Sequence, residues 1–142
     1  MRWAQQPALL INMIKEIGDE ELVFVKEWGE GKNPFTILPK YLLPDGLIAY
    51  VDDKPVVAGF MYVTTDKAMG FIAFIICNPD SDAIARGKAF PELLEGFNAK
   101  AKELGVQFLF TTTNNASLTN RLRNDGFIEC DTDVVHLLKP VK

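Results

Sequence analysis

A change of hydrophobic period near residue 47 constrains the fold more than any other feature of the chain. Three apolar runs follow it, LIAYV (47–51), PVVAGFMYVTT (55–65) and MGFIAFIIC (69–77), each with the length and composition of a strand. Short polar turns separate the runs, so we predict that they pair as consecutive antiparallel strands. The third run is apolar on both faces, which predicts a position inside the sheet.

A crossover links the third strand to the next one. Pro91 suits the first turn of a helix and Gly105 suits its end, so we expect a helix between them. VQFLFTTT (106–113) then has the composition of a strand. Because a strand–helix–strand unit is right-handed and places its strands parallel, 69–77 and 106–113 should form a parallel pair.

The chain after residue 113 predicts one more helix and two more strands. Ala116–Asp125 is short and amphipathic, and Gly126 is suited to close it. Apolar residues at 127–130 and 134–138 predict the last two strands.

The N-terminal part predicts a strand, two helices and a loop. RWAQ (2–5) has the composition of a short strand, and a second helix is expected over 22–28. A first helix is predicted from Pro7 to Gly18, because apolar residues recur at three- and four-residue spacing: Leu10, Ile11, Ile14 and Ile17. The stretch 29–46 has the Gly and Pro content of a loop, yet its apolar residues must cover the core, a pocket or a partner's surface.

Composition excludes several classes of protein. The 142 residues fit one domain spanning 1–142, and the net charge of −4 argues against binding to nucleic acid. Two distant cysteines, Cys77 and Cys130, and one histidine do not make a zinc site, so we expect no metal and two buried, reduced thiols. The N-terminus lacks a signal-peptide pattern and no uncharged run could span a bilayer, so we expect a cytoplasmic protein without a membrane partner.

Two stretches carry a resemblance to a known family. The stretch NASLTNRLRNDGF (115–127) is similar to the N-x-x-A-x-x-x-Y-x-x-x-G-F phrase of the GNAT superfamily of N-acetyltransferases. LIAYVDDKPVVAGF, with Gly59, resembles the second and third strands of that family. TNN.SL…L…GF also resembles a phage-borne GNAT subgroup. In this sequence Leu122 stands where the family often has a tyrosine that serves as general acid.

The resemblance implies a fold and an activity. The fold is α+β, a three-layer sandwich with a mixed, mostly antiparallel sheet of about six or seven strands and helices on both faces. Its parallel pair, 69–77 and 106–113, should splay apart. The implied function is transfer of an acetyl or other acyl group from acetyl-CoA to a primary amine, by direct attack in a ternary complex. The alternative is a catalytically silent module that binds CoA or a protein partner. The amine would be a small molecule or a peptide, and a homodimer through the apolar loop 35–43 remains open.

The resemblance also implies cofactor-binding residues. The family's R/Q-x-x-G-x-G/A loop best matches Arg86-Gly87-Lys88-Ala89-Phe90-Pro91, in which Ala89 replaces a glycine and Pro91 has no N–H to donate. Helix N-termini bind phosphates, so Arg86 to Ala89 are expected at the pyrophosphate, although the two cations also fit an ordinary solvated loop. The strand edge at Ile75, Ile76 and Cys77 would bind the pantetheine arm. Asn115 would bind the cofactor or cap the next helix.

No catalytic residue stands out. Tyr62, Asp66 and Cys77 are candidates by their place near strand ends. Each also has a structural interpretation: a half-buried strand tyrosine, a turn aspartate and a buried thiol.

Overall fold

The computed structural model describes residues 12–30, 43–113, 115–135, 137 and 139–141. The chain forms two compact units, residues 1–112 and 113–142, which are described separately below. The expectation of a single domain therefore stays a prediction.

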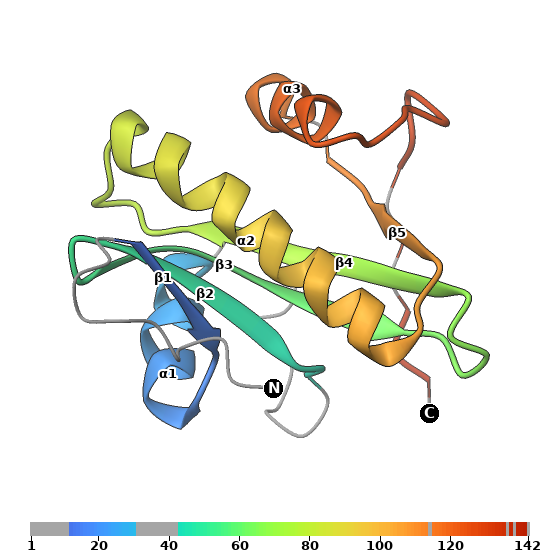
Figure 1. The fold of residues 1–142 in the computed structure, drawn as a ribbon, viewed down its shortest axis with the longest axis horizontal. Helices are drawn as coiled ribbons and strands as arrows, with labels where there is room; N and C mark the ends of the chain where they lie inside the picture. Colours follow the sequence, from blue (N-terminus) through green and yellow to red (C-terminus); the bar gives the residue numbers. More distant parts are fainter. Residues whose placement is uncertain (1–11, 31–42, 114, 136, 138, 142) are drawn as a thin grey trace. The chain divides into compact units, whose positions relative to one another are not determined.

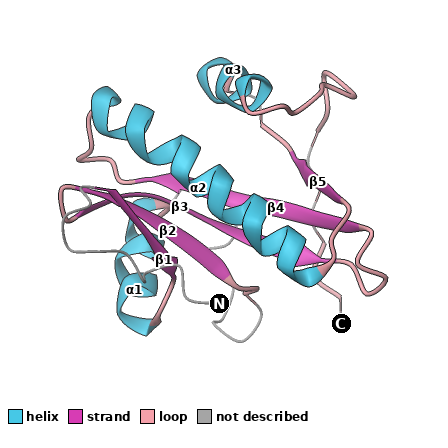
Figure 2. Ribbon diagram, in the orientation of Figure 1, coloured by secondary structure: helices cyan, strands magenta, loops and turns pink. Residues whose placement is uncertain are grey.

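A mixed five-stranded sheet forms the centre of the first unit (Figures 1 and 2). Its strands lie side by side in chain order: β1 (Asn12–Glu16), β2 (Gly46–Val51), β3 (Lys54–Val63), β4 (Met69–Cys77) and β5 (Phe108–Thr111). The first four are antiparallel and β5 is parallel to β4. The predicted meander and the predicted parallel pair are both confirmed.

The hairpin between β2 and β3 shows how local sequence specifies this sheet. Asp52 and Asp53 both have positive φ, 51° and 63°, and the flanking pair is Val51 with Lys54. Two consecutive residues with positive φ match the type I′ turn, whose twist fits two adjacent antiparallel strands. Aspartate tolerates this conformation better than most residues, so the turn follows from the sequence.

The first predicted helix, from Pro7 to Gly18, is wrong where the structure describes it. Residues Asn12–Glu16 form β1, which pairs with β2, and Ile17 N–H donates to Gly46 O at 2.9 Å. The apolar spacing of Ile14 and Ile17 fits a strand end as well as a helix, and the open edge of β2 decides between them. Gly18 does not end a helix but precedes the next one. The predicted strand 2–5 lies outside the described residues.

Helix α1 (Asp19–Trp28) covers one face of the sheet and confirms the predicted second helix. Gly18 N–H donates to the Glu21 carboxylate at 2.8 Å, and Lys15 Nζ lies 2.5 Å from the same carboxylate. Burial alone would raise the pKa of Glu21, but the bonds from Lys15 and Gly18 outweigh it and lower that pKa. The helix packs through Val25, which is fully buried among Ile48, Ala58, Phe60 and Ile76.

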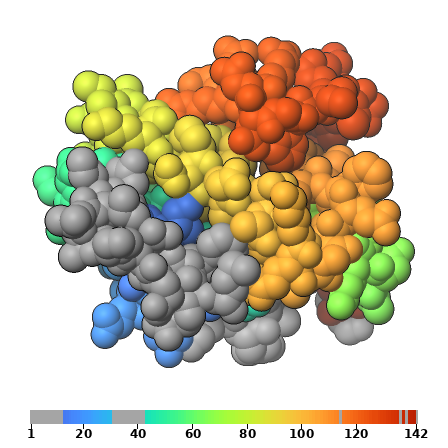
Figure 3. Space-filling model, in the orientation of Figure 1, coloured from blue at the N-terminus to red at the C-terminus, as the bar shows by residue number. Residues whose placement is uncertain are grey.

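Helix α2 (Ala83–Leu104) covers the opposite face, across β1, β2 and β3 (Figure 1), and its atoms lie in front of the sheet in the space-filling view (Figure 3). It begins eight positions before the predicted start at Pro91. Asp82 caps it by accepting a hydrogen bond from Ala85 N–H at 2.8 Å, and Asp is among the strongest capping residues. Pro91 lies inside the helix, where its missing N–H costs one hydrogen bond. The predicted end at Gly105 is confirmed by its left-handed φ of 80°.

The second unit contains helix α3 (Ala116–Asn124). Asn115 caps this helix by accepting from Leu118 N–H at 3.0 Å, and Gly126 follows it with a φ of 102°. The predicted strand at 127–130 is wrong, and the described residues of 134–138 form no strand either. The described sheet therefore has five strands rather than six or seven, because a strand needs a partner for its main-chain groups and no described residue of the second unit forms one.

Among the described residues, no helix is long and apolar enough to cross a membrane.

Candidate active site at the fork between β4 and β5

The two parallel strands share only part of their length. They pair from Met69 with Phe108 to Ile72 with Thr111, and β4 then continues to Cys77. At the last pair, the Thr111 hydroxyl donates to Ile72 O at 2.9 Å, in the direction where a main-chain donor of β5 would continue the ladder. We call this point the fork, Met69–Ile72 the paired half of β4, and Ala73–Cys77 its outer half. The predicted splay of the parallel pair is confirmed.

A β-bulge bends β4 immediately beyond the fork. Ala73 pairs with Phe60 and Ile76 pairs with Ala58, so Phe74 and Ile75 together lie opposite the single residue Gly59. Phe74 has a φ of 57°, a left-handed conformation that costs a non-glycine residue roughly 1–2 kcal/mol. Such bulges redirect the strand and are common next to active sites. The sequence pattern does not predict this bulge. The one residue that indicates it is Gly59, which lies opposite.

The bulge decides which way the main chain of the outer half points. Asn78 N–H donates to Val56 O at 2.7 Å, and Ile76 pairs with Ala58, so these two residues turn their main chain toward β3. Because successive residues of a regular strand alternate, Cys77, which lies between these two, turns its main chain toward the side where β5 no longer pairs, whereas Ile75 lies in the bulge, where the alternation is interrupted. Ile76 itself is buried in the core under α1, and Cys77 is a half-buried thiol at the end of the strand.

The predicted phosphate loop does not exist as a loop. Arg86, Gly87, Lys88 and Ala89 lie within the first two turns of α2, because Asp82 starts the helix before them. Arg86 Nε donates to Ser81 Oγ at 3.0 Å and its terminal nitrogen donates to Asn78 O at 3.3 Å. Arg86 therefore holds the connection between β4 and α2. Gly87 and Lys88 are exposed, whereas Ala89 is fully buried.

The N-terminus of α2 differs from an ordinary phosphate cradle. The Asp82 carboxylate accepts the Ala85 N–H, which is one of the donors that a phosphate would use. The negative charge at this position opposes a second anion. The start of α2 in this conformation therefore does not suit a phosphate.

No protein-family model matches the sequence, and no curated protein matches it. Solved structures do match by fold. One is the aminoglycoside acetyltransferase meta-AAC0020 from an uncultured soil metagenomic sample, in complex with sisomicin, with a TM-score of 0.61 and 16% identity. The match covers 93% of this chain and 97% of that one.

Two further structures support the same conclusion. The ribosomal-protein-S18-alanine N-acetyltransferase from Escherichia coli has a TM-score of 0.64 at 18% identity, over 84% of this chain and 79% of that chain. The aminoglycoside N-acetyltransferase AAC(6')-Iy in complex with CoA has a TM-score of 0.62 at 13% identity, over 91% and 95%. The chain has the fold of the GNAT N-acetyltransferases.

The three candidate catalytic residues occupy different parts of this GNAT fold. Tyr62 on β3 pairs with Phe71, one position before the fork, and burial raises its pKa. Cys77 lies at the far end of the outer half. Asp66 lies in the turn before β4, at the paired end, where Ala68 N–H and the Thr64 hydroxyl donate to its carboxylate and lower its pKa. The structure thus places Tyr62 beside the fork and gives Asp66 a structural task in a turn.

Two residues of the GNAT-like phrase lie in the second unit. Asn115 uses its side-chain oxygen to cap α3, which fulfils one of the two expected roles. Leu122 is buried, at 5% exposure, and carries no group that could give up a proton.

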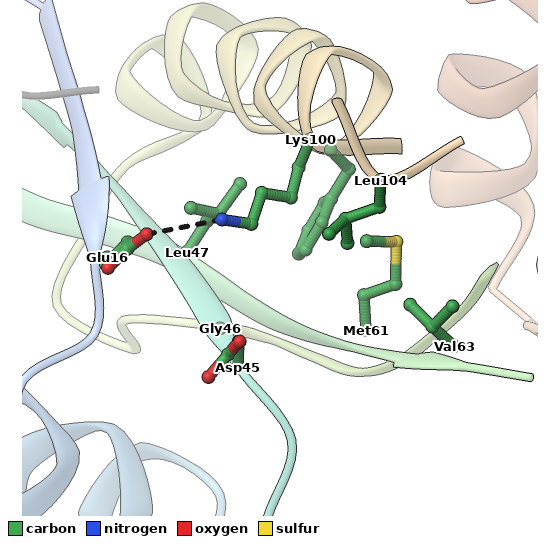
Figure 4. A pocket seen from close by; sticks show the side chains of 9 residues that line it. Glu16, Asp45, Gly46, Leu47, Met61, Val63, Lys100 and Leu104 are labelled. Atoms are coloured by element: carbon green, nitrogen blue, oxygen red, sulfur yellow. Dashed lines mark ion pairs between the residues drawn. The ribbon is translucent and has the colours of Figure 1, made fainter. Parts of the chain in front are cut away.

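A small cavity lies elsewhere in the first unit. It has a volume of about 40 Å³ between α2 and the strands β1, β2 and β3, and it contains no residue of β4 or β5 (Figure 4). Lys100 reaches across its mouth to Glu16, with 3.5 Å between Nζ and the carboxylate, above apolar walls that include Met61 and Phe97. A space of this size holds a water molecule rather than a substrate. Within the described chain, no group of three His, Cys, Asp or Glu residues is placed to hold a metal.

Proposed function

We propose that this chain transfers an acetyl group from acetyl-CoA to a primary amine, by direct attack in a ternary complex. The observation that carries the proposal is the fork, where β5 leaves β4 and a bulged main chain continues alone to Cys77. The GNAT fold supports it, since N-acetyltransferases share this fold and one of the matched structures is in complex with CoA.

The outer half of β4 would hold the donor by strand addition. An extended ligand with amide groups can pair with a strand edge as another strand would. Cys77, between two residues that turn their main chain toward β3, would offer its main-chain N–H and C=O on the opposite side. The left-handed Phe74 changes the direction of the adjacent amide, which would point a donor N–H at the thioester carbonyl and stabilise the oxyanion.

The chemical step needs little besides placement. The lone pair of the neutral amine attacks the thioester carbonyl carbon, a C–N bond forms, and the C–S bond breaks to release the CoA thiolate. The amine's proton passes to water, and water protonates the thiolate. Burial raises the pKa of Tyr62 above its ordinary value of 10.0, so this phenol is a still poorer base near pH 7 and would position a substrate by hydrogen bonding or contact. Holding both reactants at the fork supplies the main rate enhancement.

Calorimetry with acetyl-CoA and with free CoA tests this proposal directly. We expect binding to the folded protein and release of free thiol when an amine is added. Absence of binding at millimolar acetyl-CoA, with an intact thermal unfolding transition, would reject it.

A second function is favoured by one specific observation. The capped start of α2, with Asp82 in place of a phosphate cradle and Pro91 inside the helix, matches a module that has kept the fold but not the catalysis. Leu122 points the same way, because it replaces a proton donor. Binding of CoA without thiol release across a panel of amines would favour this silent module over the enzyme.

A further inference from the structure

Four aromatic rings lie together beside the fork, and the exposed ones among them are not accounted for by packing of the core. They are Tyr62 on β3, Phe71 and Phe74 on β4, and Phe110 on β5, and we call them the aromatic patch. Their rings are in contact in two pairs: Tyr62 with Phe74, at 6.3 Å between centroids, and Phe71 with Phe110, at 5.6 Å.

The patch occupies the face of the sheet on which α1 packs. Phe74 also contacts Phe60, at 6.4 Å between ring centroids, and Phe60 belongs to the core under α1. Tyr62 lies two positions after Phe60 on the same strand, so it shares that face, and its partner Phe71 shares it too. Phe110 pairs with Phe71 across the parallel ladder.

The patch is accessible and has no charge. Phe110 on β5 is 40% exposed, and Tyr62 near the end of β3 is 36% exposed, so both rings are open to a ligand. The segments that carry the patch, Val56–Val63, Met69–Cys77 and Phe108–Thr111, contain no charged residue. A ligand that binds here is therefore recognised by ring stacking and apolar contact, and a single ammonium can add a cation–π contact.

The opposite face of the sheet is the one that belongs to the donor. Gly59, opposite the bulge, faces α2, since a Cβ built there would lie 3.2 Å from the Phe97 ring. A donor that lies along the outer half of β4 and extends toward the start of α2 occupies that face and the edge. The face under α1 is left to the second substrate, and the aromatic patch is the surface it would meet next to the fork.

We infer that the acceptor is an amine that carries an aromatic or bulky apolar group, which stacks on Tyr62 and Phe110 while its nitrogen reaches the fork. This inference rests on the proposed function and adds the class of acceptor to it. It also predicts an acceptor of a different class from that of the aminoglycoside acetyltransferases with a similar fold. Sisomicin carries several ammonium groups, and the three strand segments that carry the patch offer them no carboxylate.

An acceptor panel tests the inference. Thiol release from acetyl-CoA is measured with 2-phenylethylamine, n-propylamine and sisomicin. We expect kcat/KM for 2-phenylethylamine to exceed that for n-propylamine and for sisomicin by about tenfold or more, since burial of a ring beyond a short alkyl chain is worth a factor of that order. Equal values for the two monoamines, or a preference for sisomicin, overturn the inference.

Two phenylalanines on β5 test whether the preference for an aromatic amine arises at the aromatic patch. Phe110→Ala removes a ring of the patch, whereas Phe108→Ala removes a more exposed ring, 67% against 40%, two positions farther from the fork. Phe110→Ala should lower kcat/KM for 2-phenylethylamine by about tenfold and leave the KM for acetyl-CoA within about twofold. Phe108→Ala should change neither value by more than about twofold. Equal losses in the two variants contradict the assignment, and thermal melts show that both are folded.

A binding experiment keeps the two proposals distinguishable. Saturation-transfer NMR detects 2-phenylethylamine on the protein without any turnover, and the signal should weaken in Phe110→Ala but not in Phe108→Ala. Acetyl-CoA that binds while the aromatic amine gives no signal overturns this inference alone. An aromatic amine that binds while acetyl-CoA does not rejects the proposed reaction and supports the patch.

Discussion

The paired half and the outer half of β4 belong to one strand but differ in what lies beside them. Met69–Ile72 has β3 on one side and β5 on the other, whereas beyond Ile72 the ladder with β5 has ended. Both halves are apolar and both contribute a buried isoleucine, Ile72 at 1% and Ile76 at 6% exposure. Composition therefore does not separate the structural half from the half that we assign to the donor. The two halves differ instead in their neighbouring strands, because the edge of a strand can bind a ligand only where no other strand pairs with it.

The largest expected effects come from truncating one isoleucine in each half. Ile72→Ala and Ile76→Ala should each cost about 2–5 kcal/mol of stability, because each leaves a cavity in the core. Chemical denaturation measures this loss. Ile76→Ala should also weaken acetyl-CoA binding more than Ile72→Ala does, since it loosens the outer half over α1. Equal binding in the two variants would mean that the halves are not functionally distinct.

The bulge offers a smaller and more local perturbation. A Cβ at Gly59 would lie 3.2 Å from the Phe97 ring and 3.5 Å from Ile75, so Gly59→Ala should displace the bulge and cost about 1–3 kcal/mol. We expect acetyl-CoA affinity, measured by calorimetry, to fall about tenfold, which corresponds to roughly 1.4 kcal/mol. Gly87→Ala is the matched control. Nothing lies within 4 Å of its Cβ and it is exposed in a helix, so it should gain about 0.5–1 kcal/mol.

Lowering the pH should destabilise α1, the helix that packs against Ile76 of the outer half. The pKa of Glu21 lies below its ordinary value of 4.5, so its contribution is present above that value and is lost as the pH falls through the lowered one. Glu21→Gln should cost about 1 kcal/mol at pH 7, because the bond from Lys15 loses its charge-assisted character. Melting temperatures between pH 3 and 7 should fall less steeply for the variant. Parallel curves for the two proteins would contradict this role for Glu21.

The smallest effect is expected at the fork itself. Thr111→Val keeps the side-chain shape but removes the hydroxyl that donates to Ile72 O, at a cost of roughly 1 kcal/mol or less. Amide exchange near Ile72 should become faster while the amides of Met69–Phe71 keep their protection. Uniform protection across β4 would show that this hydroxyl does not define where the strands part.

Sequence patterns predicted the elements whose structure is set locally. The Asp52-Asp53 turn, the caps at Gly105 and Asn115, and the apolar strand 69–77 follow from the conformations those residues prefer. Patterns failed where a distant partner decides. Asn12–Glu16 forms a strand because β2 offers an edge to pair with, whereas 127–130 forms none and no described residue of its unit is in a strand that it could pair with.

The candidate site was predicted in part for the same reason. The crossover from 69–77 to 106–113 implied a parallel pair, but no pattern in the sequence marks the residue at which the pair separates, where Thr111 donates to Ile72 O. The left-handed Phe74 has no sequence signature, since phenylalanine seldom adopts that conformation. The start of α2 was misplaced because two signals competed. Pro91 suits a first turn, and Asp82 suits a cap, and the cap starts the helix.

The capped start of α2 has a consequence for affinity. The Asp82 carboxylate competes with any phosphate for the Ala85 N–H. Because it belongs to the same chain, it competes at a high effective concentration. A phosphate has to displace the carboxylate before it can bind. The helix end is therefore stable without a ligand, and its affinity for phosphate is low. Replacement of Asp82 by a neutral residue would then raise the affinity for a nucleotide more than the addition of a basic residue would.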